Sequence, residues 1–263
     1  MGLGVPRLDQ LAAGLGAEGG GPGDGGGVGD GGGDGRADGA ESPALRELFA
    51  TLVTMTGDER RVLLQQVFAA CRNDNGDPEF VAERAWVARL ARDYPADVGV
   101  VAALLLNLVE LAPMEGVYLP AGNLHAYLGG VGIEIMACSD NVLRGGLTPK
   151  HVDVAELLKV LRFTAGEVAV LRPRRVGPEE VFDAPAAEFR LSRMVLSRQP
   201  GAEPVELTGD GPQVVLCTEG AVSLRGDGVT LEVPKGSSAY VPASATGTTI
   251  TGDGTAFRAT VPG

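Results

Sequence analysis

The stretch Val117–Asp153 constrains this 263-residue chain most, because ionisable side chains alternate there with apolar side chains and glycine turns. Both histidines of the chain, His125 and His151, lie in this stretch. Ionisable groups placed this densely among Val, Ile and Leu are costly to bury unless they are paired, hydrogen-bonded or bound to a metal. The stretch is therefore the first place to look for a functional site.

The composition limits the partners that the chain can bind. The apolar fraction of 44% and the charged fraction of 21% are typical of a globular protein. The formal net charge of −12 argues against a nucleic-acid partner, whose phosphates require a basic surface. A few Arg and Lys side chains in a cleft are still enough to bind a small phosphorylated molecule.

Three widely separated cysteines, Cys71, Cys138 and Cys217, show no CxxC spacing and no disulfide framework. The longest apolar run, Val98–Leu106, is far shorter than the roughly 20 residues that span a bilayer. The first residues also lack the basic and apolar regions of a signal peptide. We therefore expect a cytoplasmic protein with no membrane partner.

Residues 1–41 and residues 42–112 differ sharply in their content of apolar side chains. Residues 1–41 are rich in Gly and Asp and cannot bury enough apolar surface to fold, so we expect a disordered segment. Residues 42–112 predict a helical domain that begins with Ser42 as N-cap and Pro43 in the first turn. Within this range, Val98–Leu108 is apolar nearly all round, which predicts a buried helix.

From residue 113 the pattern favours β-structure. Short apolar runs between Gly and Pro turns in residues 113–175 predict part of a β-barrel wall, followed by a helix over Val152–Leu161. Residues 176–263 alternate apolar and polar side chains and resemble the strands of a cupin, a small jelly-roll barrel. Glu219 and Glu232 are isolated there, which is typical of a solvated sheet face.

The sequences YLPAGNLHAYL and GIEIMACSDNVLRGGLTPKHVDV, inside the stretch described first, resemble the signature region of type I mannose-6-phosphate isomerases, which are zinc-dependent. The resemblance extends upstream through RDYPADVGVVAALLLNLVELAP. It implies a mixed α and β fold of cupin-type barrels with a helical domain. The implied activity is the interconversion of mannose 6-phosphate and fructose 6-phosphate, with Zn2+ as the cofactor.

This reaction moves a proton between carbons 1 and 2 of the sugar through an enediol. It requires a general base, stabilisation of the enediolate oxygens and cationic groups for the phosphate. Zinc with an open coordination position can polarise the sugar oxygens.

On residue chemistry alone, a single histidine between Leu and Ala is more often structural than a metal ligand. The resemblance implies that His125 is a zinc ligand. In an extended strand His125 and Tyr127 share one face, so Tyr127 is expected on the substrate side. In GIEIMA the same alternation predicts that Glu134 and Met136 point inward. The resemblance makes Glu134 an active-site carboxylate, and an ion pair with Arg144 is the alternative.

Arg144 precedes a Gly-Gly turn, where a guanidinium can approach a phosphate or an enediolate without crowding. The resemblance implies a catalytic and substrate-binding role for Arg144, and substrate binding by Lys150. It also makes Asp140 an acid–base or orienting group, although Asp140 and Asn141 could simply cap a turn. His151, adjacent to Lys150, is expected to be structural.

The resemblance stops short in the N-terminal half. Type I enzymes hold zinc with four protein groups, three of them from a Gln-x-His pair and a Glu after a His-Lys-Pro segment, and this sequence contains neither motif. We therefore expect an incomplete catalytic barrel, whose missing part is an N-terminal segment or a separate chain. The alternative function is that of a truncated, non-catalytic cupin-like remnant that binds a sugar phosphate.

Overall fold

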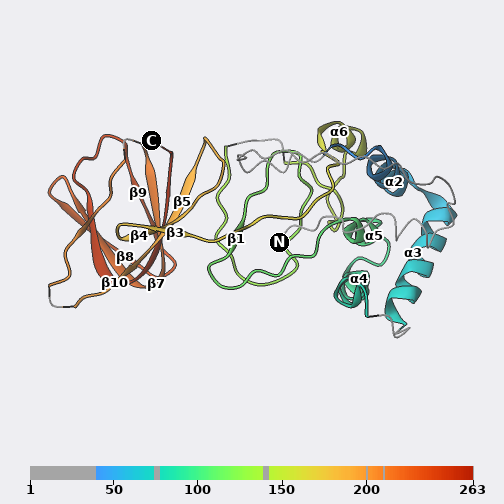
Figure 1. Ribbon diagram of the computed structural model, residues 1–263, viewed down its shortest axis with the longest axis horizontal. Coiled ribbons are helices and arrows are strands. Elements are labelled where there is room, and N and C mark those ends of the chain that lie inside the picture. The colour runs from blue at the N-terminus through green and yellow to red at the C-terminus, as the bar shows by residue number, and fades with distance from the viewer. Residues whose placement is uncertain (1–39, 74–77, 139–141, 200, 210, 263) are drawn as a thin grey trace, which may run out of the picture. The chain divides into compact units, whose positions relative to one another are not determined.

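The computed structural model describes residues 40–73, 78–138, 142–199, 201–209 and 211–262, which form two compact units (Figure 1). Most of the segment expected to be disordered, and Asp140 in the signature stretch, lie outside the described residues. The division into residues 1–41, 42–112, 113–175 and 176–263 stays a prediction.

The first unit, called the helical unit here, contains the described helices together with Leu119–Gly130 and the described residues of Asn141–Ala169. None of the helices in the described ranges is long and apolar enough to cross a bilayer. The helices are α2 (Pro43–Thr54), α3 (Gly57–Arg72), α4 (Val81–Asp93), α5 (Gly99–Ala102), the 3-10 helix η1 (Ala103–Leu105) and α6 (Val154–Val160).

Two helix starts follow from capping residues in the sequence. Ser42 caps α2, as predicted, because its hydroxyl oxygen accepts a hydrogen bond from the Leu45 N–H at 3.3 Å. Asp153 caps α6 in the same way by accepting from the Glu156 N–H at 2.9 Å. The helix expected over Val152–Leu161 is thereby confirmed.

The buried helix expected over Val98–Leu108 is shorter than predicted. Helical structure covers α5 and η1, and Leu106 already has an extended backbone with φ −116° and ψ 145°. The predicted burial is confirmed for Val100 and Leu105. An apolar run predicts that a segment is buried, but it does not by itself predict where a helix ends.

The second unit, called the strand unit here, contains Leu111–Tyr118, the described residues of Val131–Asp140 and the residues from Val170 onward. Its first two strands form a separate antiparallel pair, β1 (Gly116–Val117) with β2 (Val170–Leu171). The other strands form one antiparallel sheet in the order β3-β4-β5-β10-β7-β8, with β6 beside β10 and β9 beside β7. These strands are β3 (Arg174–Val176), β4 (Glu179–Phe182), β5 (Arg190–Leu196), β6 (Val205–Glu206), β7 (Gln213–Gly226), β8 (Val229–Pro234), β9 (Ser238–Val241) and β10 (Thr249–Thr260).

The long strands β7 and β10 each pair with different strands along their length. The first part of β7 pairs with β9 and its last part pairs with β8, while β10 likewise divides between β6 and β5. Within β7, Gly220 has φ +64°, and a Cβ there would lie 2.0 Å from the Asp253 carbonyl oxygen. Only glycine permits this close approach of the two backbones.

The strands that the alternating pattern predicts after residue 176 are confirmed. They enclose a core of Met194, Leu207, Val215, Cys217, Val222, Leu224, Val233, Ala239, Val241, Ile250 and Ala256.

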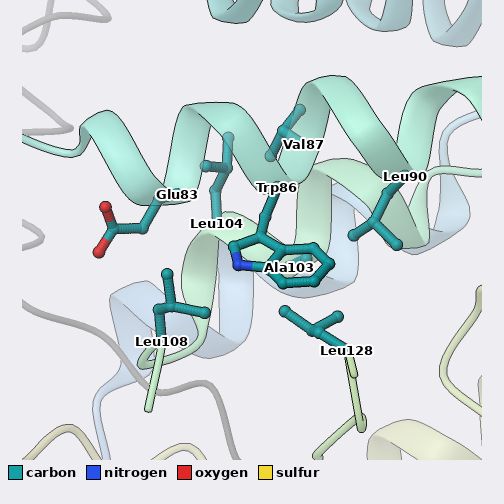
Figure 2. A pocket seen from close by; sticks show the side chains of 8 residues that line it. All are labelled: Glu83, Trp86, Val87, Leu90, Ala103, Leu104, Leu108 and Leu128. Carbon is teal, nitrogen blue, oxygen red and sulfur yellow. The ribbon is translucent and has the colours of Figure 1, made fainter. Parts of the chain in front are cut away.

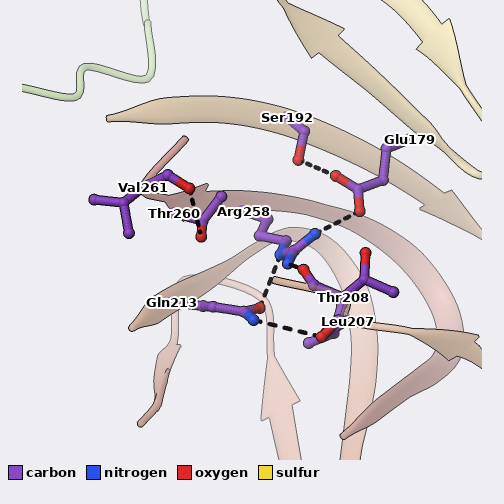
Figure 3. Close-up of polar contacts among 8 residues, drawn as sticks. All are labelled: Glu179, Ser192, Leu207, Thr208, Gln213, Arg258, Thr260 and Val261. Atoms are coloured by element: carbon purple, nitrogen blue, oxygen red, sulfur yellow. Dashed lines mark hydrogen bonds and ion pairs between the residues drawn. The ribbon is translucent and has the colours of Figure 1, made fainter. Parts of the chain in front are cut away.

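A buried ionic network links four strands of this sheet. The Arg258 guanidinium donates to Gln213 Oε1 at 2.8 Å and to Glu179 Oε1 at 2.6 Å. It also donates to the Thr208 carbonyl oxygen (Figure 3). The second carboxylate oxygen of Glu179 accepts from the Ser192 hydroxyl at 2.5 Å. Because each buried charge has a partner, the network joins β4, β5, β7 and β10 without leaving an unpaired ion.

The barrel wall expected within residues 113–175 is only partly formed as sheet. In the described residues between Tyr118 and Asp153 there is no hydrogen-bonded strand, and β1 and β2 supply the pairing on either side. The side chains nevertheless alternate between half-buried and exposed positions along 123–128 and 133–138. A ladder needs a neighbouring strand to bond with, so alternation predicts an extended chain but cannot supply the partner.

The three free cysteines differ in exposure, since Cys138 is exposed, Cys71 is half-buried and Cys217 is buried. Burial raises the pKa of the Cys71 thiol above its usual value, and the charge of Arg84 opposes this only in part. Because the thiolate is the reactive form, we expect iodoacetamide at about pH 7.5 to modify Cys138 first, Cys71 more slowly and Cys217 only after unfolding. Peptide mass spectrometry over time measures the order, and faster modification of Cys71 than of Cys138 would contradict it.

Candidate functional site

The segment around His125 presents two different faces. Leu124, Ala126 and Leu128 are half-buried, whereas His125 and Tyr127 are exposed. This is the alternation of an extended chain. The rings of His125 and Tyr127 meet edge to face, with centroids 5.9 Å apart. The prediction that these two side chains share one face is therefore confirmed.

The helical unit holds the opposite face of this segment. Leu128 lies against Trp86, Leu90 and Leu104 around a cavity of about 10 Å³, and the Trp86 ring reaches from α4 towards Leu128 (Figure 2). A cavity this small leaves room for no more than about one water molecule. A Cβ at Gly129 would lie 3.8 Å from the Trp86 ring. This packing anchors the apolar face and leaves His125 directed away from the core.

The Arg144 turn lies directly against the His125 segment. A Cβ at Gly145 would be 2.6 Å from a methyl carbon of Leu124, the residue before His125. Gly145 therefore allows the backbone after Arg144 to rest on that segment. Arg144 itself is exposed, as is His125. The helical unit thus presents a cationic and an imidazole side chain from two segments that touch.

Lys150 and His151 follow this turn before α6, and both are exposed. The Lys150 N–H donates to the Thr148 hydroxyl at 3.2 Å, which fixes the backbone and leaves the Lys150 ammonium outside the core.

Glu134 belongs to the strand unit, in Val131–Asp140. Glu134 and Met136 are exposed and Ile133 and Ile135 are half-buried, so the predicted alternation is present. The predicted direction is wrong, because the two isoleucines face the core and Glu134 and Met136 face outward. The other carboxylate expected at the site, Asp140, lies outside the described residues.

A residue that the sequence reasoning did not identify, Asp97, contacts the Arg144 turn. Its carboxylate accepts from the Leu147 N–H at 2.7 Å. Asp97 also accepts from the N–H of Gly99, the first residue of α5, at 2.7 Å. The Asp-x-Gly pattern at the start of an apolar run is a capping signal, but nothing in it indicates the second contact, 50 residues further along the chain.

The described residues do not form a metal site by themselves. Among them, no three His, Cys, Asp or Glu side chains gather as metal ligands would. Zinc in proteins normally has three or four protein ligands. The Nδ1 atom of His125 lies 3.1 Å from the Asn123 carbonyl oxygen. A hydrogen bond there would orient the ring and leave Nε2 as the ring nitrogen able to bind a metal, as is common for histidine ligands.

No family model matches the chain, whereas individual proteins do. The mannose-6-phosphate isomerase of Escherichia coli (strain K12) is 34% identical over 222 residues, which make up 83% of this chain and 54% of that protein. Mannose-6-phosphate isomerase 2 of Arabidopsis thaliana is 32% identical over 200 residues, or 76% of this chain and 45% of that protein. The chain spans about half the length of the curated relatives it matches.

A solved structure supports the same relationship. The mannose 6-phosphate isomerase of Salmonella typhimurium, solved with its substrate F6P and zinc, superposes on this chain with a TM-score of 0.70 and 34% identity. The match covers 82% of this chain and 54% of that one. The fold places the chain in the class of mixed α and β proteins that combine a helical unit with an antiparallel cupin-type sheet. Within that class, this chain is related to the mannose-6-phosphate isomerases.

Proposed function

We propose that this chain is an aldose–ketose isomerase that interconverts mannose 6-phosphate and fructose 6-phosphate. The observation that carries the proposal is the contact between the His125 and Arg144 segments of the helical unit, made through Leu124 and Gly145, while the His125 and Arg144 side chains are both exposed. Relatives named for this activity match most of the chain, and one of them was solved with F6P and zinc.

The spacing of two residues supports the assignment of roles. Two solved mutants of the Salmonella typhimurium enzyme replace a glutamate and, ten positions later, an arginine by alanine. Glu134 and Arg144 have the same separation in this chain. We assign Glu134 to proton transfer between the two sugar carbons. Arg144 is assigned to the phosphate or to the enediolate oxygens, because its planar fork can donate two parallel hydrogen bonds.

Tyr127 and Lys150 are assigned to substrate binding, with the Lys150 ammonium as a second cation for the phosphate. Asp140 is retained as an acid–base or orienting group.

Zinc is the proposed cofactor, with His125 as its ligand in the described part of the chain. The other ligands would come from outside the described residues, either from this polypeptide or from a separate chain that supplies the upstream half. When bound, zinc would polarise the sugar oxygens. We place the activity in the cytoplasm, because free thiols such as the buried Cys217 are typical of a reducing compartment.

A coupled assay on the purified 263-residue protein tests the proposal. With mannose 6-phosphate and added zinc, we expect fructose 6-phosphate to form, a chelator to stop its formation and zinc to restore it. Zinc content after dialysis is measured in parallel. A folded protein that gives no turnover and retains no zinc would overturn the proposal in favour of a non-catalytic remnant. Fructose 6-phosphate titrated against that protein would then show whether binding remains.

A further inference from the structure

The turn that carries Arg144 has a conformation that its own residues do not favour. Leu147 has φ +54° and Gly146 has φ +131°. A leucine in the left-handed region is strained unless surrounding contacts hold it there. The turn therefore depends on anchors outside its own sequence.

Two anchors are present in the helical unit. The Leu147 side chain packs against the core of that unit. The Leu147 N–H donates to Asp97 Oδ2 at 2.7 Å, while Asp97 Oδ1 accepts from the Gly99 N–H at 2.7 Å. One carboxylate thus links the start of α5 to the turn through two charge-assisted hydrogen bonds.

The backbones of the two linked segments are in direct contact. A Cβ at Gly146 would lie 2.8 Å from the Gly99 Cα atom, and a Cβ at Gly99 would lie 3.0 Å from the Gly146 Cα atom. On its other side the turn rests on Leu124 through Gly145. The turn is therefore enclosed between α5 and the His125 segment, and Asp97 supplies the polar link that sets its position.

We propose that Asp97 is a positioning residue for Arg144. Its carboxylate fixes the Arg144–Leu147 turn against α5 and so determines the position from which the Arg144 side chain extends. Asp97 does not touch the substrate. The effect on substrate rests on the proposed function, whereas the effect on the turn does not.

The test compares Asp97→Asn with the wild-type chain. The amide side chain retains one acceptor oxygen, so it can satisfy only one of the two backbone N–H groups. By NMR we expect the Leu147 amide to exchange with solvent about ten-fold faster, and fructose 6-phosphate to bind about ten-fold more weakly. Asp97→Glu, which keeps both acceptor oxygens, should recover part of each loss. The control Asp93→Asn removes an exposed carboxylate at the end of α4 and should change neither quantity.

A double substitution separates positioning from general destabilisation. If Asp97 acts through Arg144, Asp97→Asn should cause no further loss of affinity in an Arg144→Ala background, titrated at millimolar ligand. Unchanged Leu147 exchange in Asp97→Asn would overturn the proposal, and so would an equal loss of affinity in both backgrounds. If the wild-type chain does not bind fructose 6-phosphate, the proposed function fails, and Leu147 exchange still decides whether Asp97 holds the turn.

Discussion

Replacing Arg258 with methionine is expected to destabilise the strand unit by about 3–5 kcal/mol, because it leaves a buried carboxylate without its partner. The Arg258 side chain is 4% exposed and that of Glu179 is 12% exposed. The substitution also removes the donors to Gln213 and to the Thr208 carbonyl. Urea unfolding followed by circular dichroism measures the loss.

Two further variants show that the loss comes from the unpaired charge. Arg174→Met breaks an ion pair with Asp183 whose side chains are 64% and 58% exposed, and it should cost no more than about 1 kcal/mol. Adding Glu179→Leu to Arg258→Met removes the stranded charge and should recover much of the stability. If Arg258→Met and Arg174→Met cost the same, the network would not have the structural importance inferred from its burial.

Arg144→Ala is expected to lower the isomerase turnover proposed for this chain roughly a thousand-fold, because it removes the donors assigned to the phosphate or enediolate oxygens. The exposed position of Arg144 predicts little change in melting temperature. Zinc should stay bound in this variant, whereas His125→Ala should lose both zinc and turnover. The coupled assay and metal analysis of the same samples measure these effects.

Arg92→Ala is the matched control, because Arg92 is an exposed arginine of the helical unit in the last turn of α4, which carries none of the proposed site residues. It should retain wild-type turnover. Near-normal turnover in Arg144→Ala would show that the active site lies elsewhere. A similar loss in Arg92→Ala would indicate a general effect of net charge on the substrate.

Sequence patterns predict local structure well where it depends only on residues that are close together in the sequence. Ser42 and Pro43 start α2 because a side-chain cap acts within one turn. The alternation after residue 176 predicts strands that the structure confirms. The same alternation around His125 and Glu134 predicts which side chains share a face, but not whether the backbone finds a strand to pair with.

The sequence by itself determined that His125 and Tyr127 share one face, because side chains two positions apart in an extended segment point to the same side. It also determined that Arg144 precedes a Gly-Gly pair, which favours a turn. Only the tertiary structure decided that this turn rests on Leu124 and that Asp97, 50 residues from Leu147, holds it. The physical reason is that hydrogen bonds and packing between distant segments depend on how the chain folds back, which no local pattern specifies.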